Sequence, residues 1–254
     1  MKVTFLGTGT SQGVPVITCD CEVCNSTDWH DKRLRSSVLI ETDNTIIVID
    51  AGPDFRQQML RENVKKLDAV LITHQHKDHI AGLDDVRAYN YTQKKFMDVY
   101  GDERVVKAIK QEFAYSFSEN KYPGVPDINL ILIKNQKIKV NDLEIVTIEV
   151  MHHKLPIFGF RIEDFTYITD ANYITESEKS KIIGTKVLVL NALRIKKHIS
   201  HFTLDEALEL IVEIKPEKAY LTHISHYLGF YEVVKKQLPK NVFLSYDGLK
   251  LDIN

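Results

Sequence analysis

The sequence predicts an α/β fold in which many short strands are interspersed with helices. Three observations support this fold class. Apolar, β-branched runs recur along the chain, helical patterns lie between them, and no linker rich in Pro, Gly or Ser divides the sequence. A length of 254 residues allows one large domain or two small ones. We expect residues 1–254 to form a single domain.

The expected strands are short runs of a length typical of globular proteins. In chain order they are Val3–Leu6, Ser37–Glu41, Thr45–Ile49, Ala69–Ile72, Leu130–Ile133, Leu143–Val150, Thr166–Ile168, Val187–Leu190, Ala219–Leu221 and Val242–Ser245. Their number and spacing favour a sheet-based architecture over a helical bundle.

Four helices are expected between these strands, at Asp54–Glu62, Asp102–Ala114, Thr203–Lys215 and Tyr227–Gln237. The third has the strongest signal. Thr203 and Glu206 have the spacing of a capping box, and four apolar residues of that segment share one face. Pro216 follows directly and ends the helix, since proline cannot continue it.

The segment 113–127 differs from its surroundings because it is aromatic, polar and interrupted by Pro and Gly. Two interpretations stay open. It is a loop over a site, where Tyr115, Phe117 and Tyr122 could stack on a base, or it is a plain connector.

Composition and charge exclude several classes of protein. The net charge of -2 argues against a protein that coats nucleic acid. The N-terminus lacks the pattern of a signal peptide, and the longest apolar runs are far shorter than the ~20 residues that span a bilayer. We therefore expect a cytoplasmic protein in a reducing setting, with no membrane partner.

The most informative stretch is Leu71-Ile72-Thr73-His74-Gln75-His76-Lys77-Asp78-His79, which follows a strand that is expected to be buried. Metal ions bind neutral imidazole and carboxylate at fixed reach. Alternate residues His74, His76 and Asp78 can project together, and His79 joins them as the chain turns into a helix. The sequence therefore predicts a metal site at this strand end.

A second candidate metal site comes from the cysteines. Cys19, Cys21 and Cys24 are the three cysteines of the chain and lie within six residues. An odd number cannot pair completely, and thiols this close rarely form a disulfide framework. A metal site is the better interpretation.

The pattern H-x-H-x-D-H resembles the metallo-β-lactamase superfamily, which implies a four-layer αββα sandwich and two active-site metals. The family's further ligands match residues that each follow a strand-like run, namely His152 or its neighbour His153, Asp170 and His223. The resemblance implies that His74, His76 and His152 hold one metal. It implies that Asp78, His79 and His223 hold the other and that Asp170 bridges them. His152 is chosen because His152-x-Lys154-Leu155-Pro156 matches a motif of relatives, but His153 stays open.

The N-terminal segment resembles one branch of this superfamily. Gly7, Gly9 and Gly13 do not have the spacing of a dinucleotide fingerprint, and no helix follows them. The segment with its C-x-C-x-x-C motif is instead similar to the start of PhnP-type phosphodiesterases. That resemblance implies a structural zinc held by the cysteines and by His226, three residues after His223.

The resemblance also implies a reaction. PhnP-type enzymes carry a histidine before the capped helix that acts as a general acid or binds the phosphate, and His201 matches it. His198 is expected to be a solvated loop residue. The implied function is hydrolysis of a small cyclic or nucleotide-like phosphodiester with two divalent ions, Zn or Mn. Asp78 would be a ligand that also orients the nucleophile. A homodimer fits the family, and no stable nucleic-acid complex is expected.

Several alternatives stay open. A tRNA 3′-processing nuclease shares H-x-H-x-D-H, although this chain shows no Gly/Lys-rich arm for tRNA. Thioesterases of the glyoxalase type and lactonases share the metals but lack the cysteine cluster. Pyrroloquinoline-quinone biosynthesis proteins carry a similar cluster. A non-catalytic metal-binding protein is the alternative from a different class.

Overall fold

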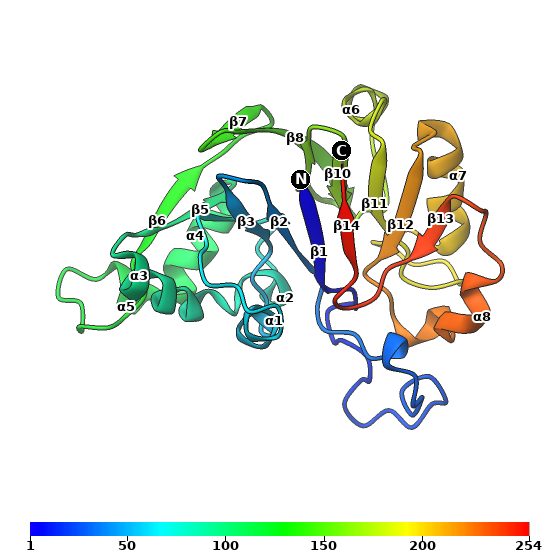
Figure 1. Ribbon diagram of the computed structural model, residues 1–254, viewed down its shortest axis with the longest axis horizontal. Helices are drawn as coiled ribbons and strands as arrows, with labels where there is room; N and C mark the ends of the chain where they lie inside the picture. Colours follow the sequence, from blue (N-terminus) through cyan, green and yellow to red (C-terminus); the bar gives the residue numbers. More distant parts are fainter. Residues whose placement is uncertain (254) are drawn as a thin grey trace.

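The computed structural model describes residues 1–253 and contains two sheets of seven strands each (Figure 1). The first sheet comprises, in spatial order, β14 (Lys250–Asp252), β1 (Lys2–Gly7), β2 (Ser37–Glu41), β3 (Ile46–Ile49), β4 (Ala69–Leu71), β5 (Met97–Gly101) and β6 (Ile128–Leu132). The second comprises β13 (Val242–Leu244), β12 (Lys218–Thr222), β11 (Val187–Asn191), β10 (Phe165–Ile168), β9 (Leu155–Ile162), β8 (Leu143–His152) and β7 (Lys137–Val140).

Helices lie outside the two sheets, as Figure 1 shows. Beside the first sheet are α1 (Phe55–Arg61), α2 (Lys77–Ile80), α3 (Arg87–Gln93), α4 (Glu103–Glu112) and α5 (Ala114–Phe117), and beside the second are α6 (Glu176–Ile182), α7 (Leu204–Ile214) and α8 (Tyr231–Lys235). Short 3₁₀ turns occur at Trp29–Asp31, Leu83–Val86 and His226–Leu228. The arrangement is the predicted four-layer αββα sandwich.

The strands have apolar residues on both faces because each sheet is covered on both sides. In β11, Val187 and Val189 belong to the buried cluster between the sheets. Leu188 and Leu190 belong to the cluster beneath the outer helices. A strand with two buried faces appears in the sequence as a continuous apolar run, which is why these strands were predictable.

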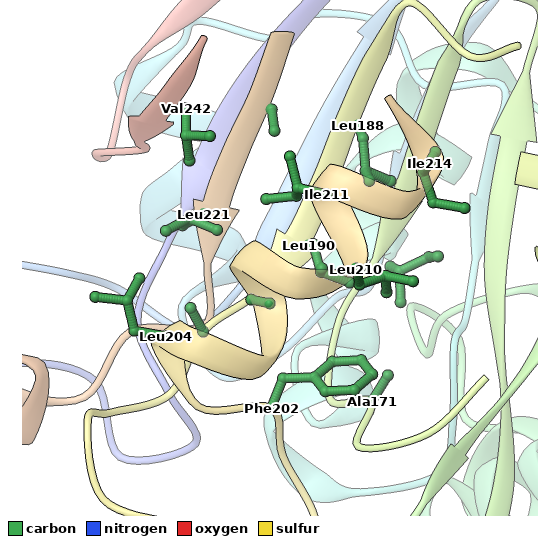
Figure 2. Close-up of a cluster of buried hydrophobic side chains, with 14 of the residues drawn as sticks. Ala171, Leu188, Leu190, Phe202, Leu204, Leu210, Ile211, Ile214, Leu221 and Val242 are labelled. Atoms are coloured by element: carbon green, nitrogen blue, oxygen red, sulfur yellow. The ribbon is translucent and has the colours of Figure 1, made fainter. Parts of the chain in front are cut away.

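Helix α7 covers the outer face of the second sheet. Its residues Leu210, Ile211 and Ile214 lie in the same buried cluster as Leu188 and Leu190 (Figure 2). The predicted capping box is present, since Thr203 Oγ1 accepts from the Glu206 amide and a Glu206 carboxylate oxygen accepts from the Thr203 amide. The helix is thereby fixed at the end of the loop that carries His201.

Some expectations about elements were wrong. The helix expected over Tyr227–Gln237 is only α8, because Gly229 has φ 112° and separates it from the preceding 3₁₀ turn. Strands β5, β7, β9 and β14 were not expected. Strand β9 contains Pro156 and Gly159, two residues that disfavour strand interiors.

The strand ends determine where the site lies. Strands β3 to β6 run parallel to one another, and so do β10 to β13. The Phe158 amide of β9 donates to the Thr73 carbonyl just after β4, at 3.0 Å. This hydrogen bond joins the two sheets beside the histidine-rich turn. Within residues 1–253, no helix has the length and apolar character needed to cross a bilayer.

The packing of α7 generates a stability prediction. Ile211 is 4% exposed and belongs to the core cluster, whereas its neighbour Val212 is 70% exposed. We expect Ile211→Ala to lower the free energy of unfolding by about 2–5 kcal/mol, because it leaves a cavity. Val212→Ala is the matched control and should change it by under about 0.5 kcal/mol. Urea denaturation measures both, and an equal loss in the two variants would contradict the packing described.

Candidate metal centre

The histidine-rich turn begins at the end of β4. Thr73 is held in place because its amide donates to Asp50 Oδ1 at 2.8 Å. His74, the next residue, is buried, and its Nε2 lies 3.0 Å from His76 Nδ1. Helix α2 then starts at Lys77, so its single turn brings Asp78 and His79 back toward the same point. His74 thus lies beside His76, and Asp78 Oδ2 lies 3.0 Å from His79 Nε2.

Asp50 was not predicted as a site residue, although it lies at the centre of this turn. Its carboxylate accepts from the Thr73 amide and lies 2.7 Å from His79 Nδ1. Asp50 is fully buried. The contact fixes the His79 ring with Nε2 facing the site. The only sequence signal was an aspartate directly after the strand ending at Ile49, and that position is also common for a turn residue.

His152 comes from the second sheet, at the end of β8. Its Nδ1 lies 2.7 Å from the Asp170 carbonyl and 3.0 Å from the Ser200 carbonyl. Carbonyls only accept, so this nitrogen carries the hydrogen and Nε2 is unprotonated. His153, the alternative, is exposed and its amide donates to Asn172. His152 therefore is the histidine that faces the cluster.

Asp170 and His223 complete the cluster. Asp170 Oδ2 lies 3.2 Å from His223 Nδ1 and 3.4 Å from His79 Nε2. Its other oxygen lies 3.1 Å from His201 Nε2. Asp50 and His223 directly follow β3 and β12, Asp170 comes two residues after the end of β10, and each of the three has φ between 55° and 65°. A non-glycine residue in this region costs on the order of 1 kcal/mol, and such strain clusters at functional sites.

Within this histidine and aspartate cluster, three groups of donor atoms are close enough to share an ion. They are His74, His76 and His152; His74, His79 and Asp170; and His152, Asp170 and His201. The first is the predicted first set. The second differs from the predicted set of Asp78, His79 and His223. His223 Nδ1 lies 3.2 Å from Asp170 Oδ2, and Asp78 Oδ2 lies 3.0 Å from His79 Nε2.

A buried nitrogen favours a metal in this cluster. Among residues 1–253, His223 Nε2 is a ring nitrogen without a hydrogen-bond partner, although the residue is only 1% exposed. An unpartnered buried polar atom costs a few kcal/mol, so a ligand is needed to satisfy it. Imidazole nitrogens beside carboxylates suit zinc, manganese or iron. The residues present therefore fit divalent metal ions.

The charge states of His74, His223 and Asp170 suit this chemistry, whereas at His79 the carboxylates of Asp78, Asp50 and Asp170 outweigh burial and hold its pKa well above the usual range. Burial lowers the pKa of His223 to about 4 and holds the pKa of His74 well below its usual range. Burial would raise the pKa of Asp170, but the nearby His223 and His79 outweigh it and hold that pKa well below its usual range. Neutral imidazoles and an ionised carboxylate are the forms that bind metals.

The cysteines form a separate cluster with His226. The three sulfurs lie 3.2 Å, 3.3 Å and 3.3 Å from His226 Nδ1, for Cys19, Cys21 and Cys24 respectively. All four donor atoms lie within 4.8 Å of one another. Three sulfurs and one nitrogen at this mutual spacing could hold a metal ion, and such a donor set suits zinc.

The remaining predictions concern loops. His201 is 9% exposed and faces Asp170, as expected for a site residue. His198 is not a free solvated residue, because its Nδ1 lies 3.1 Å from His201 Nδ1. In segment 113–127, the Tyr115 hydroxyl donates to Asp84, and Tyr122 is 80% exposed. Figure 1 places that segment, which contains α5, at one end of the molecule next to α3.

Comparisons with known proteins agree with this geometry. A family model described as beta-lactamase superfamily domain matches residues 45–224. A crystal structure of a diphosphatase from the PhnP family is 38% identical, covers 100% of this chain and 98% of that one, and has a TM-score of 0.93. Zinc-bound PqqB from Methylobacterium extorquens has a TM-score of 0.82 at 19% identity, with full coverage of both chains, which shows the fold alone.

Curated relatives match over part of their own length. An octanoyltransferase of Porphyromonas gingivalis is 39% identical over 257 residues, covering 100% of this chain and 52% of that relative. A ribonuclease Z of Prochlorococcus marinus is 29% identical over 176 residues, covering 65% of this chain and 50% of that relative. The chain thus spans about half the length of the curated relatives it matches. The family model covers most of the chain, so this protein belongs to the metallo-β-lactamase superfamily, where it is similar to the PhnP family.

Proposed function

We propose that this hydrolase cleaves small phosphodiesters, cyclic or nucleotide-like, with two divalent ions in the active site. The proposed ligands are His74, His76 and His152 for one ion, Asp78, His79 and His223 for the other, and Asp170 between them. The observation that carries the proposal is the position of Asp170, whose carboxylate lies within 3.4 Å of His79, His201 and His223. We also propose that residues 1–254 act as one domain, because one buried cluster joins both sheets.

Charge favours an anionic substrate. When bound, two divalent cations supply Lewis-acid charge that activates water and offsets the negative charge of a phosphate. Asp78 and Asp170 are the carboxylates of the proposed ligand set, so they neutralise only part of that charge. An anionic ester best matches the remaining positive charge. A small substrate fits better than a nucleic acid, because the chain has no excess of basic residues.

The chain's own residues would position and protonate the substrate. Asp50 holds the His79 ring through a 2.7 Å contact, and the carbonyls of Asp170 and Ser200 hold His152. Asp78 would orient the nucleophile. His201 Nε2, 3.1 Å from Asp170, would protonate the leaving oxygen or hold the phosphate.

Diphosphate hydrolysis is a second candidate for the same site. It is favoured by the full-length similarity, at 38% identity, to a protein described as a PhnP-family diphosphatase. Cleavage of a phosphoanhydride uses the same charge and geometry as cleavage of a phosphodiester, so the leaving group decides between them. We place tRNA processing third, because the ribonuclease Z relative matches only 65% of this chain.

We expect His201→Ala to lower turnover of a phosphodiester by about 10²-fold or more, the usual contribution of a general acid. Metal content should stay unchanged, because His201 is outside the proposed ligand set. Steady-state kinetics with a bis-aryl phosphodiester and elemental analysis measure the two properties. Full activity in this variant would remove the proposed role of His201.

A substrate panel distinguishes the candidate reactions. It contains bis-aryl phosphodiesters, 2′,3′-cyclic nucleotides, nucleoside diphosphate esters, lactones, pre-tRNA and an octanoyl thioester, each with zinc or manganese. The thioester is included because one relative is named an octanoyltransferase. Inactivity on all of them with intact metal content would favour a metal-binding protein without catalysis.

The next prediction concerns the metal content of the cysteine cluster. We expect three metal ions per chain in the purified protein and two in Cys21→Ala, because the cluster around His226 loses a ligand. His153→Ala is the matched control and should retain three, since His153 is exposed and faces away from the cluster. Elemental analysis measures all three proteins. Equal metal content in the wild type and Cys21→Ala would rule out the structural site.

A further prediction concerns Asp50, which orients a ligand without belonging to the proposed ligand set. We expect Asp50→Asn to lower metal affinity of the active site about 10–100-fold, the typical loss when the partner of a metal-binding histidine is changed. Competition with a chelator measures this affinity. Asp205→Asn, at an exposed position in α7, should leave it unchanged. Equal affinity in both variants would show that Asp50 does not support His79.

A further inference from the structure

The chain that leaves β10 turns away from the sheet before it reaches the candidate metal centre. The parallel pairing of β10 with β11 ends at Ile168 and Leu190. Asn191, the last residue of β11, pairs with Thr222 of β12 on its other side. Beyond Ile168 the chain turns at Asp170, whose φ is 61°. The backbone after this turn is buried and needs hydrogen-bond partners other than a neighbouring strand.

The Asn191 side chain is such a partner. Asn191 Oδ1 accepts from the Ala171 amide at 2.8 Å, and Asn191 Nδ2 donates to the Ala171 carbonyl at 2.9 Å. Because a backbone amide only donates and a carbonyl only accepts, these two contacts fit a single orientation of the side-chain amide. Asn191 is fully buried. A buried amide costs free energy unless it is hydrogen-bonded, so the two contacts hold Asn191 and Ala171 together.

The segment of Asp170 and Ala171 positions three side chains of the site. The Asp170 carboxylate belongs to this segment directly. The Asp170 carbonyl accepts from His152 Nδ1 at 2.7 Å. The Ala171 carbonyl accepts from the amide of Phe202, the residue after His201, at 2.7 Å. Two successive peptide units therefore fix one proposed ligand, orient the ring of another, and hold the backbone beside His201.

We infer that Asn191 is a positioning residue for the metal centre, which fixes the Asp170 carboxylate among its histidines by holding the next peptide unit. Its side chain replaces a neighbouring strand, because it offers one acceptor and one donor to the same residue. The left-handed conformation of Asp170 costs some energy at a non-glycine residue, and two buried hydrogen bonds directly after it compensate that cost. The consequence for metal binding rests on the proposed function, in which Asp170 lies between two ions.

Amide hydrogen exchange tests the contact without reference to a reaction. The Val189 amide, in the centre of β11 with paired strands on both sides, serves as the reference for the core. In the zinc-loaded wild type, the Ala171 amide should exchange slowly. Asn191→Leu removes both hydrogen bonds at nearly constant volume. It should accelerate exchange at Ala171 about tenfold or more relative to Val189, which corresponds to the net contribution of one hydrogen bond. NMR of the ¹⁵N-labelled protein measures both amides.

Thr166→Val is the matched control. Thr166 is a buried residue of β10 whose hydroxyl donates to Thr185, so this change also replaces a buried polar side chain by an apolar one of similar volume. The exchange ratio of Ala171 to Val189 should stay at its wild-type value, since a loss of overall stability accelerates both amides together. If Asn191→Leu does not fold, Asn191→Ala takes its place. Rapid exchange of Ala171 in the wild type overturns the inference without any variant, and equal ratios in the Asn191 variant and the control overturn it as well.

Metal binding tests the consequence for the site. Asn191→Leu should weaken binding of the active-site ions about 10–100-fold, the usual loss when a group that holds a metal ligand in place is changed. Competition of the zinc-loaded protein with a chelator measures this affinity, and Thr166→Val should leave it unchanged. In the manganese-loaded protein, the EPR signal of two exchange-coupled ions should weaken in Asn191→Leu and persist in the control.

Equal affinity or equal coupling in these two variants overturns the positioning role. A wild type that binds no pair of ions at the proposed ligands refutes the proposed function instead, and it leaves the hydrogen-exchange result standing. The two failures are therefore distinguishable, because the contact between Asn191 and Ala171 is measured independently of any metal pair.

Discussion

The site depends on the contacts that the buried carboxylate of Asp170 makes. It reaches His79 from the first sheet and His201 and His223 from the second, over 3.1–3.4 Å. A buried charge is costly unless partners compensate it. Because these histidines come from three different loops, their mutual positions follow from the need to surround one carboxylate. The two sheets are thereby joined at the point where chemistry is proposed.

Rigid strands bring the site residues to this point, and sharp turns direct them into it. Asp50, Asp170 and His223 each leave a strand in the left-handed conformation. A residue with that φ reverses the chain direction within one step, so its side chain meets the site rather than continuing along the sheet. The conformation costs some energy at a non-glycine residue, and the buried contacts of these three residues compensate that cost.

Local patterns predicted much of this structure, and tertiary contacts explain what they missed. The histidine turn is visible in the sequence because its residues are contiguous, and the strands are visible because both faces are buried. Strand β7, with exposed lysines alternating along it, has no such apolar run. Asp50 and His79 meet across 29 residues, and a single aspartate after a strand has many ordinary roles. His198 was expected to be solvated, and its contact with His201 was missed. Two histidines three residues apart in a loop give no sequence signal that their rings meet.

The short segment after β12 links both candidate metal sites. His223 faces Asp170, and His226 faces the cysteine sulfurs. Between them, the Ile224 amide donates to the Thr8 carbonyl, and its own carbonyl accepts from Thr10. These backbone hydrogen bonds connect the segment to the chain that leads into the cysteine loop. A metal at the cysteines would therefore hold His223 in place through the two residues that separate it from His226. A site outside the active centre would then have a direct physical effect on the geometry of that centre.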